Sequence, residues 1–122
     1  MNTTPTYFFC GIGGSGMLPL ASILRASGAR VVGSDRSLDA GRLAPKFEYL
    51  ETLGIGLAPQ DGSGLEPGMT LVTSAAVEET IPDVVRASEL GLDRLTRPQL
   101  VHRQVVEADV GQDRDRGLVE RY

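Results

Sequence analysis

Cysteine, histidine and lysine each occur only once in this sequence, and acidic side chains outnumber basic ones by 16 to 12. A single cysteine cannot form an internal disulfide, and no Cys/His cluster points to zinc, so the composition favours a reducing compartment. The negative balance argues against general nucleic-acid binding, which needs clustered Lys and Arg. The sequence also has neither a signal-peptide pattern nor an apolar run approaching the roughly 18 residues of a membrane span. We therefore expect a cytoplasmic protein whose partners are neither nucleic acid nor membrane.

What is present describes one ordinary globular domain. The chain has 122 residues, of which 41% are hydrophobic and 23% charged. That size is enough for one hydrophobic core and too small for two. We expect residues 1–105 to form the domain and residues 106–122, which mix charges without periodicity, to be a disordered tail.

Strand and helix patterns alternate along the domain. Short apolar runs predict strands at residues 7–10, 30–33, 55–58, 70–73 and 92–95, and helical spacing predicts helices at residues 17–27, 43–53 and 81–90. Thr96 and Gln99 form a capping-box pattern at the start of a last helix, with Leu100, Val101 and Val105 on one side. The alternation predicts an α/β fold: a Rossmann-like, doubly wound, mainly parallel five-stranded sheet with helices on both faces. In such a fold the ligand crevice lies at the carboxyl ends of the strands.

The first strand runs into a glycine-rich segment that satisfies G-x-G-x-x-G, from Gly11 to Gly16. Gly11 would make the sharp turn, Gly13 would let the backbone approach a diphosphate, and Gly16 would let the helix pack closely. The first helical amides would then face the anion. The alternative interpretation is a glycine-rich turn needed only for packing.

Asp35 is the second candidate, because it ends the second strand 19 residues beyond Gly16. An acidic side chain at about this spacing meets the nucleoside in dinucleotide-binding folds. The alternative interpretation of Asp35 is a helix N-cap or a solvated turn.

Taken together, GIGGSGM after a strand, GSD at the end of the next, TSAA after the fourth and TRPQL at the last helix resemble the Mur ligase family. The resemblance covers residues 6 to 105 of this chain and the N-terminal domain of those enzymes. It is greatest to members that join L-alanine, or a murein peptide, to UDP-N-acetylmuramate. It implies a Rossmann-like domain that holds the UDP part of this sugar nucleotide. The implied contacts are Gly11, Ile12, Gly13, Gly14, Ser15, Gly16, Met17, Ser34, Asp35, Thr73, Ser74 and Ala75.

The resemblance also implies chemistry for the full-length ligase. ATP and Mg²⁺ would activate the sugar's carboxylate as an acyl phosphate, which an amine then attacks. This chain lacks the G-x-x-x-x-G-K-[ST] loop that such chemistry needs, and Lys46 follows no glycine loop. We expect an N-terminal domain with no cofactor and no catalytic or metal-binding residue of its own, and central and C-terminal ligase domains downstream.

Two other functions remain open from the sequence. A NAD(P)-binding domain of an oxidoreductase would share the glycine motif and Asp35, and a stand-alone module could sense a UDP-sugar without catalysis. We interpret Cys10 as a small buried thiol, His102 as a surface residue and Arg97 as a solvated cation.

Overall fold

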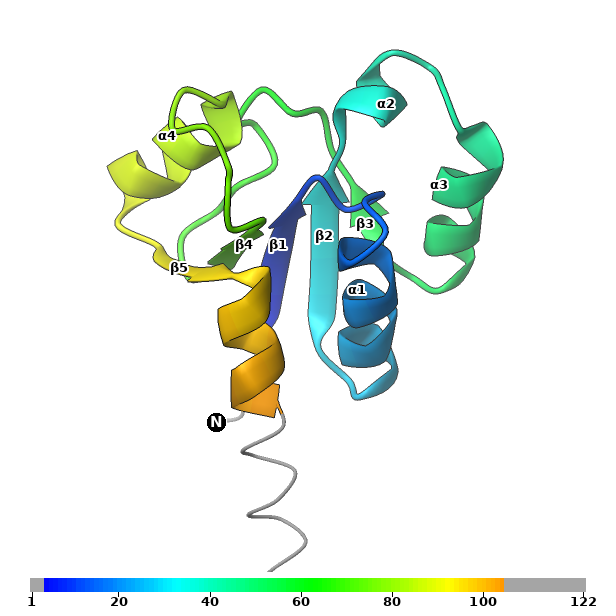
Figure 1. Ribbon diagram of the computed structural model, residues 1–122, viewed down its shortest axis with the longest axis horizontal. Helices are drawn as coiled ribbons and strands as arrows, with labels where there is room; N and C mark the ends of the chain where they lie inside the picture. Colours follow the sequence, from blue (N-terminus) through cyan, green and yellow to red (C-terminus); the bar gives the residue numbers. More distant parts are fainter. Residues whose placement is uncertain (1–3, 105–122) are drawn as a thin grey trace, which may run out of the picture.

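The computed structural model of the protein describes residues 4–104, which build one five-stranded sheet in the order β3-β2-β1-β4-β5 (Figure 1). Every neighbouring pair of strands is parallel. The predicted α/β, Rossmann-like fold is therefore confirmed. The strands are β1 (Thr6–Cys10), β2 (Arg30–Ser34), β3 (Gly56–Leu57), β4 (Thr70–Thr73) and β5 (Asp93–Thr96). The helices with both ends described are α1 (Met17–Ala26), α2 (Arg36–Asp39), α3 (Ala44–Thr52) and α4 (Pro82–Leu90).

The two faces of the sheet bury separate apolar clusters, because successive strand residues point to opposite sides. Phe9 packs on one face with Leu24 of α1 and Leu50 of α3. Phe8 packs on the other face with Val84 of α4 and with Leu65, from the long connection between β3 and β4. Helices thus cover both faces, as the alternating pattern predicts.

Three local features differ from the sequence prediction. The short helix α2 follows Asp35 directly and was not predicted, because four residues are too few to show a helical period. Strand β3 keeps only two of the four residues predicted for it. Strand β5 lies one residue later than predicted. No helix among residues 4–104 is long and apolar enough to cross a membrane.

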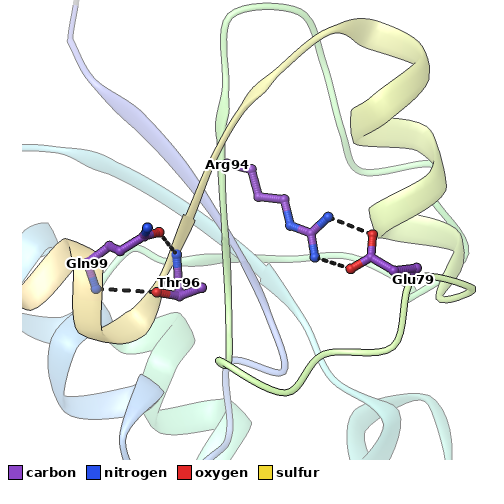
Figure 2. Close-up of polar contacts among 4 residues, drawn as sticks. All are labelled: Glu79, Arg94, Thr96 and Gln99. Atoms are coloured by element: carbon purple, nitrogen blue, oxygen red, sulfur yellow. Dashed lines mark hydrogen bonds and ion pairs between the residues drawn. The ribbon is translucent and has the colours of Figure 1, made fainter.

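The last helix starts at residue 97 and is described as far as residue 104. Its predicted capping box is confirmed: the Thr96 amide donates to Gln99 Oε1 at 2.8 Å, and the Gln99 amide donates to Thr96 Oγ1 at 3.4 Å (Figure 2). Leu100 is fully buried and joins the cluster of Phe9. Val105 and the predicted tail, residues 106–122, lie outside the described residues.

A buried carboxylate connects α4 to β2 and to the connection after β3. Asp83 has no exposed surface, and its Oδ2 accepts a hydrogen bond from the Ser34 hydroxyl at 2.5 Å. Its Oδ1 accepts from the Gly62 amide at 2.8 Å. Both carboxylate oxygens are therefore satisfied inside the protein, as burial of a polar group requires.

Gly33 provides a test of packing beneath the glycine loop. A Cβ at this position would lie 2.5 Å from Ile12 Cδ1 and 2.7 Å from Ile12 Cβ. We expect Gly33→Ala to lower the free energy of unfolding by about 1–3 kcal/mol, the usual cost of overpacking a core. Urea denaturation measures this change. Gly56→Ala is the matched control, because a Cβ there meets only Val32 atoms at 3.6 Å or more; an equal loss in both variants would contradict the packing argument.

Asp83 provides a test by pH. Loss of hydration on burial is the main cause that raises the pKa of its carboxyl above 3.8, and the hydrogen bonds from Ser34 and Gly62 oppose the shift. A raised pKa means that the folded state binds the proton more tightly, so this contribution to stability is fully present below pH 3.8 and is lost as the pH rises through the folded pKa.

Asp83→Asn cannot titrate. We therefore expect the free energy of unfolding of the wild type, minus that of Asp83→Asn, to decrease as the pH is raised from about 3 through the pKa that Asp83 has in the folded state. Urea denaturation at a series of pH values gives the difference, and a difference independent of pH would refute the assignment. The altered hydrogen-bonding pattern of the amide adds only an offset that does not vary with pH.

Candidate functional site

A crevice of about 310 Å³ opens at the carboxyl ends of β1, β2 and β4. In the strand order, β2 and β3 lie on one side of β1 while β4 and β5 lie on the other, so the chain changes direction between β1 and β4. Ligands in open parallel sheets bind at such a switch point. Three of the predicted site residues, Gly11, Asp35 and Ser74, line this crevice. The other seven lining residues were not predicted as ligand contacts: Cys10, Arg36, Gln60, Ala76, Val77, Glu78 and Ile81.

The glycine loop connects β1 to α1 above the sheet, where the arrowheads of β1 and β2 point in Figure 1. Gly11 has φ = +83°, so the sharp turn predicted there is present and requires glycine. The amides of Gly11 and Ile12 both donate to the Ser34 carbonyl, at 2.8 and 2.9 Å. The Gly14 amide donates to the Gly11 carbonyl at 3.1 Å. Most of the loop's donors are thus used to hold the loop itself.

The donors that remain are at the end of the loop. Within residues 4–104, the amides of Ser15 and Gly16 have no hydrogen-bond acceptor, and both residues precede the first turn of α1. That first turn contains no acidic side chain. The positive end of the helix dipole and these two N–H groups coincide, which is the arrangement that attracts an anion.

Gly13 is crowded by the protein's own side chains. A Cβ on Gly13 would lie 2.9 Å from Asp35 Oδ2 and 3.2 Å from two ring carbons of Phe47. The Gly13 amide donates to the same Asp35 oxygen at 2.8 Å. The structure therefore gives an internal reason for glycine at this position, where the sequence argument supposed a diphosphate.

Asp35 combines a cap with a contact to the loop. Its Oδ1 accepts a hydrogen bond from the Ser37 amide at 2.8 Å and caps α2, while its Oδ2 accepts a hydrogen bond from the Gly13 amide. The N-cap interpretation of Asp35 is confirmed. Its carboxylate also lines the crevice, so the residue joins α2, the glycine loop and the candidate site.

Two cations reach the glycine loop from elements distant in sequence. The Lys46 ammonium, on α3, donates to the Gly13 carbonyl at 2.9 Å. Arg97, at the start of the last helix, lies beside Gly16, where a Cβ would be 2.8 Å from its Nε. Sequence reasoning missed Lys46 because helical spacing showed only that it neighbours the core residue Phe47. It also left Arg97 as a solvated cation, although Arg97 packs against the loop while remaining exposed.

Several predicted site residues have side chains directed into the protein. Ile12 and Met17 belong to the core cluster of Phe9. Ser34 is fully buried, and its hydroxyl donates a hydrogen bond to Asp83. Thr73 is also fully buried, and its Oγ1 has no hydrogen-bond partner among the described residues. Exposed positions are left at Gly14, Ser15, Ser74 and Ala75, and Ala75 does not line the crevice.

Cys10 lines the crevice as a buried thiol, as the sequence predicts. Burial is the main cause that raises its pKa to about 11, and the charge of Asp83 adds to the shift. The group is therefore protonated at neutral pH and is no nucleophile. His102 is exposed on the last helix. No group of three or more His, Cys, Asp or Glu side chains within residues 4–104 is arranged to hold a metal ion.

The wall of the crevice formed by residues 74–81 is attached to the sheet by an ion pair. Arg94 of β5 donates to both carboxylate oxygens of Glu79, at 2.8 and 2.6 Å (Figure 2). The hydrogen bonds from Arg94 are the main cause that lowers the pKa of Glu79. Arg94 was not singled out in the sequence, because its partner lies 15 residues away and shares no periodic pattern with it.

Comparison with known proteins gives a consistent relationship. Residues 6–106 match the family described as "Mur ligase family, catalytic domain". The UDP-N-acetylmuramate–L-alanine ligase of Limosilactobacillus reuteri is 40% identical over 100 residues, which are 82% of this chain and 22% of that protein. The chain therefore spans about a fifth of the length of such curated relatives.

Two solved structures share the fold. A UDP-N-acetylmuramate-alanine ligase from Thermotoga maritima superposes with a TM-score of 0.72 at 24% identity, over 84% of this chain and 23% of that one. A UDP-N-acetylmuramate:L-alanyl-gamma-D-glutamyl-meso-diaminopimelate ligase from Neisseria meningitides gives 0.72 at 26% identity, over 86% of this chain and 32% of that one. The family match covers most of the sequence, and the chain belongs to the Mur ligase family.

Proposed function

We propose that this chain is the N-terminal, UDP-N-acetylmuramate-binding domain of an ATP-dependent ligase of peptidoglycan precursors. The observation that carries the proposal is the pair of unused amides at Ser15 and Gly16, placed at the amino end of α1 in the same loop that reaches the crevice at Gly11. These donors suit the oxygens of a diphosphate. The names of the family's members supply the identity of the sugar nucleotide.

The site residues divide into two groups under this proposal. Contacts with the diphosphate come from the loop's exposed end, through the amides of Ser15 and Gly16 and the Ser15 hydroxyl. Asp35 and Ser74 line the crevice and are assigned to the nucleoside and to the opposite wall. Ser34 and Thr73 support the site from below, because both side chains are buried.

Amide-bond formation belongs to the whole ligase. The chain contains no G-x-x-x-x-G-K-[ST] sequence, so its residues do not fit an ATP and Mg²⁺ site and we assign them no step of the reaction. Their part is to bind and orient the sugar nucleotide, whose carboxylate the rest of the enzyme would activate. The central and C-terminal domains of the ligase are the expected partners of this one.

Titration with ligands tests the proposal directly. On adding UDP-N-acetylmuramate to the 122-residue chain, we expect the largest amide shifts at Ser15 and Gly16, because their N–H groups gain acceptors, with smaller shifts at Asp35. Two-dimensional NMR of the labelled protein measures them. NAD should leave these signals unchanged at the same concentration; if NAD moves them at a lower concentration than any uridine nucleotide, the chain is instead a dinucleotide-binding domain.

A substitution at Gly14 tests the position of the diphosphate. A Cβ on Gly14 would make ordinary contacts, 3.4 Å from the Gly11 carbonyl oxygen and 3.7 Å from Met17 Cγ, so the fold should tolerate Gly14→Ala. The added methyl group stands on the exposed end of the loop, and we expect it to weaken UDP-N-acetylmuramate binding roughly tenfold. Calorimetric titration gives the affinity, and thermal unfolding verifies the fold. Gly56→Ala, on the edge strand, should bind as the wild type does; unchanged binding by Gly14→Ala would place the diphosphate elsewhere.

A further inference from the structure

We propose that Lys46 is a positioning residue for the diphosphate: it fixes the glycine loop in its binding shape and makes affinity depend on the phosphate groups. The inference rests on the proposed function, since it assigns a role within the same site. It concerns a residue on α3, which lies outside the glycine motif and outside the crevice lining.

Gly13 is hydrogen-bonded through both of its backbone polar atoms. Its amide donates to Asp35 Oδ2 at 2.8 Å, and its carbonyl accepts from Lys46 Nζ at 2.9 Å. Both polar atoms of one loop residue are therefore held by side chains, one from the end of β2 and one from α3. Glycine-rich backbone has many accessible conformations, so a loop that binds through its own amides needs such restraints.

The direction of the Gly13 carbonyl is set by Lys46. The negative end of the Gly13 carbonyl faces the Lys46 ammonium instead of the amino end of α1. Without Lys46, the peptide unit that carries this carbonyl is held only by the hydrogen bond from the Gly14 amide to Gly11. If that unit turned, its carbonyl oxygen would repel a phosphate oxygen. Lys46 thus keeps an acceptor away from the place where Ser15 and Gly16 offer donors.

Lys46 also places a positive charge near the loop. Lys46 is the only lysine of the chain, it is half-buried, and no carboxylate within residues 4–104 lies within 4.0 Å of its ammonium group. Its positive charge is consequently not cancelled by an ion pair in the described part of the chain. A partly buried charge acts over several ångströms, so a diphosphate bound at the loop's end lies within its field.

The position and charge of Lys46 predict a dependence of affinity on phosphate that a merely structural residue would not produce. We expect Lys46→Met to weaken the binding of UDP roughly tenfold, as for the loss of one charge interaction at a partly screened site. The affinity for uridine, which has no phosphate, should change by less than about twofold. Lys46→Arg should restore most of the UDP affinity, and added salt should weaken UDP binding to the wild type more than to Lys46→Met.

Calorimetric titration of the 122-residue chain with UDP, UMP and uridine measures these affinities, and NMR of the ligand-free variants shows whether the Ser15 and Gly16 signals shift. Arg30→Met is the matched control, because it removes the same charge at the amino end of β2, away from the carboxyl ends of the strands where the crevice lies. Equal UDP affinity in the wild type and Lys46→Met would overturn the inference, and so would an equal loss for UDP and uridine. If the wild type binds no uridine nucleotide, the proposed function itself fails, which is a different result.

Discussion

The carboxyl end of β2 holds the candidate site together. The carbonyl of Ser34 accepts hydrogen bonds from the amides of both Gly11 and Ile12, so the turn that follows β1 is attached to the neighbouring strand. The hydroxyl of the same residue is bonded to Asp83, and this bond connects β2 to α4. The next residue, Asp35, caps α2 and binds Gly13. Two consecutive residues thus set the glycine loop, a helix start and one wall of the crevice.

This arrangement changes the meaning of the glycine motif. The motif is usually read as bare backbone made available to phosphate, but here the amides from Gly11 to Gly14 all bond to the protein. Gly13 has no room for a side chain because Asp35 and Phe47 occupy that space. The glycines build the loop, and the ligand would meet only its last amides. Close packing accounts for the glycines up to Gly14, and the proposed anion binding concerns the amides of Ser15 and Gly16, so the two interpretations of the sequence are compatible.

The sequence was most informative where a pattern repeats over several residues. Short apolar runs and helical spacing predicted the five strands and the longer helices, and the Thr96 capping box was correct because its two partners lie three residues apart. The short α2 has no period to detect. The contact between Ser34 and Asp83 spans 49 residues, and that between Lys46 and Gly13 spans 33. Such contacts depend on the folded arrangement of strands and helices, and no local spacing encodes them.

The same distinction explains which site residues could be predicted. Gly11 and Asp35 were found because each follows a predicted strand, where parallel sheets form their crevice, and Ser74 was implied by the resemblance to the Mur ligase family. The cations at the loop follow no strand, because Lys46 comes from a helix interior and Arg97 from a helix start. A glycine motif on a Rossmann-like sheet is common to proteins with different ligands. The residues that reach it from elsewhere in the fold differ from one family to another, so selectivity among phosphate ligands should depend on them more than on the glycines.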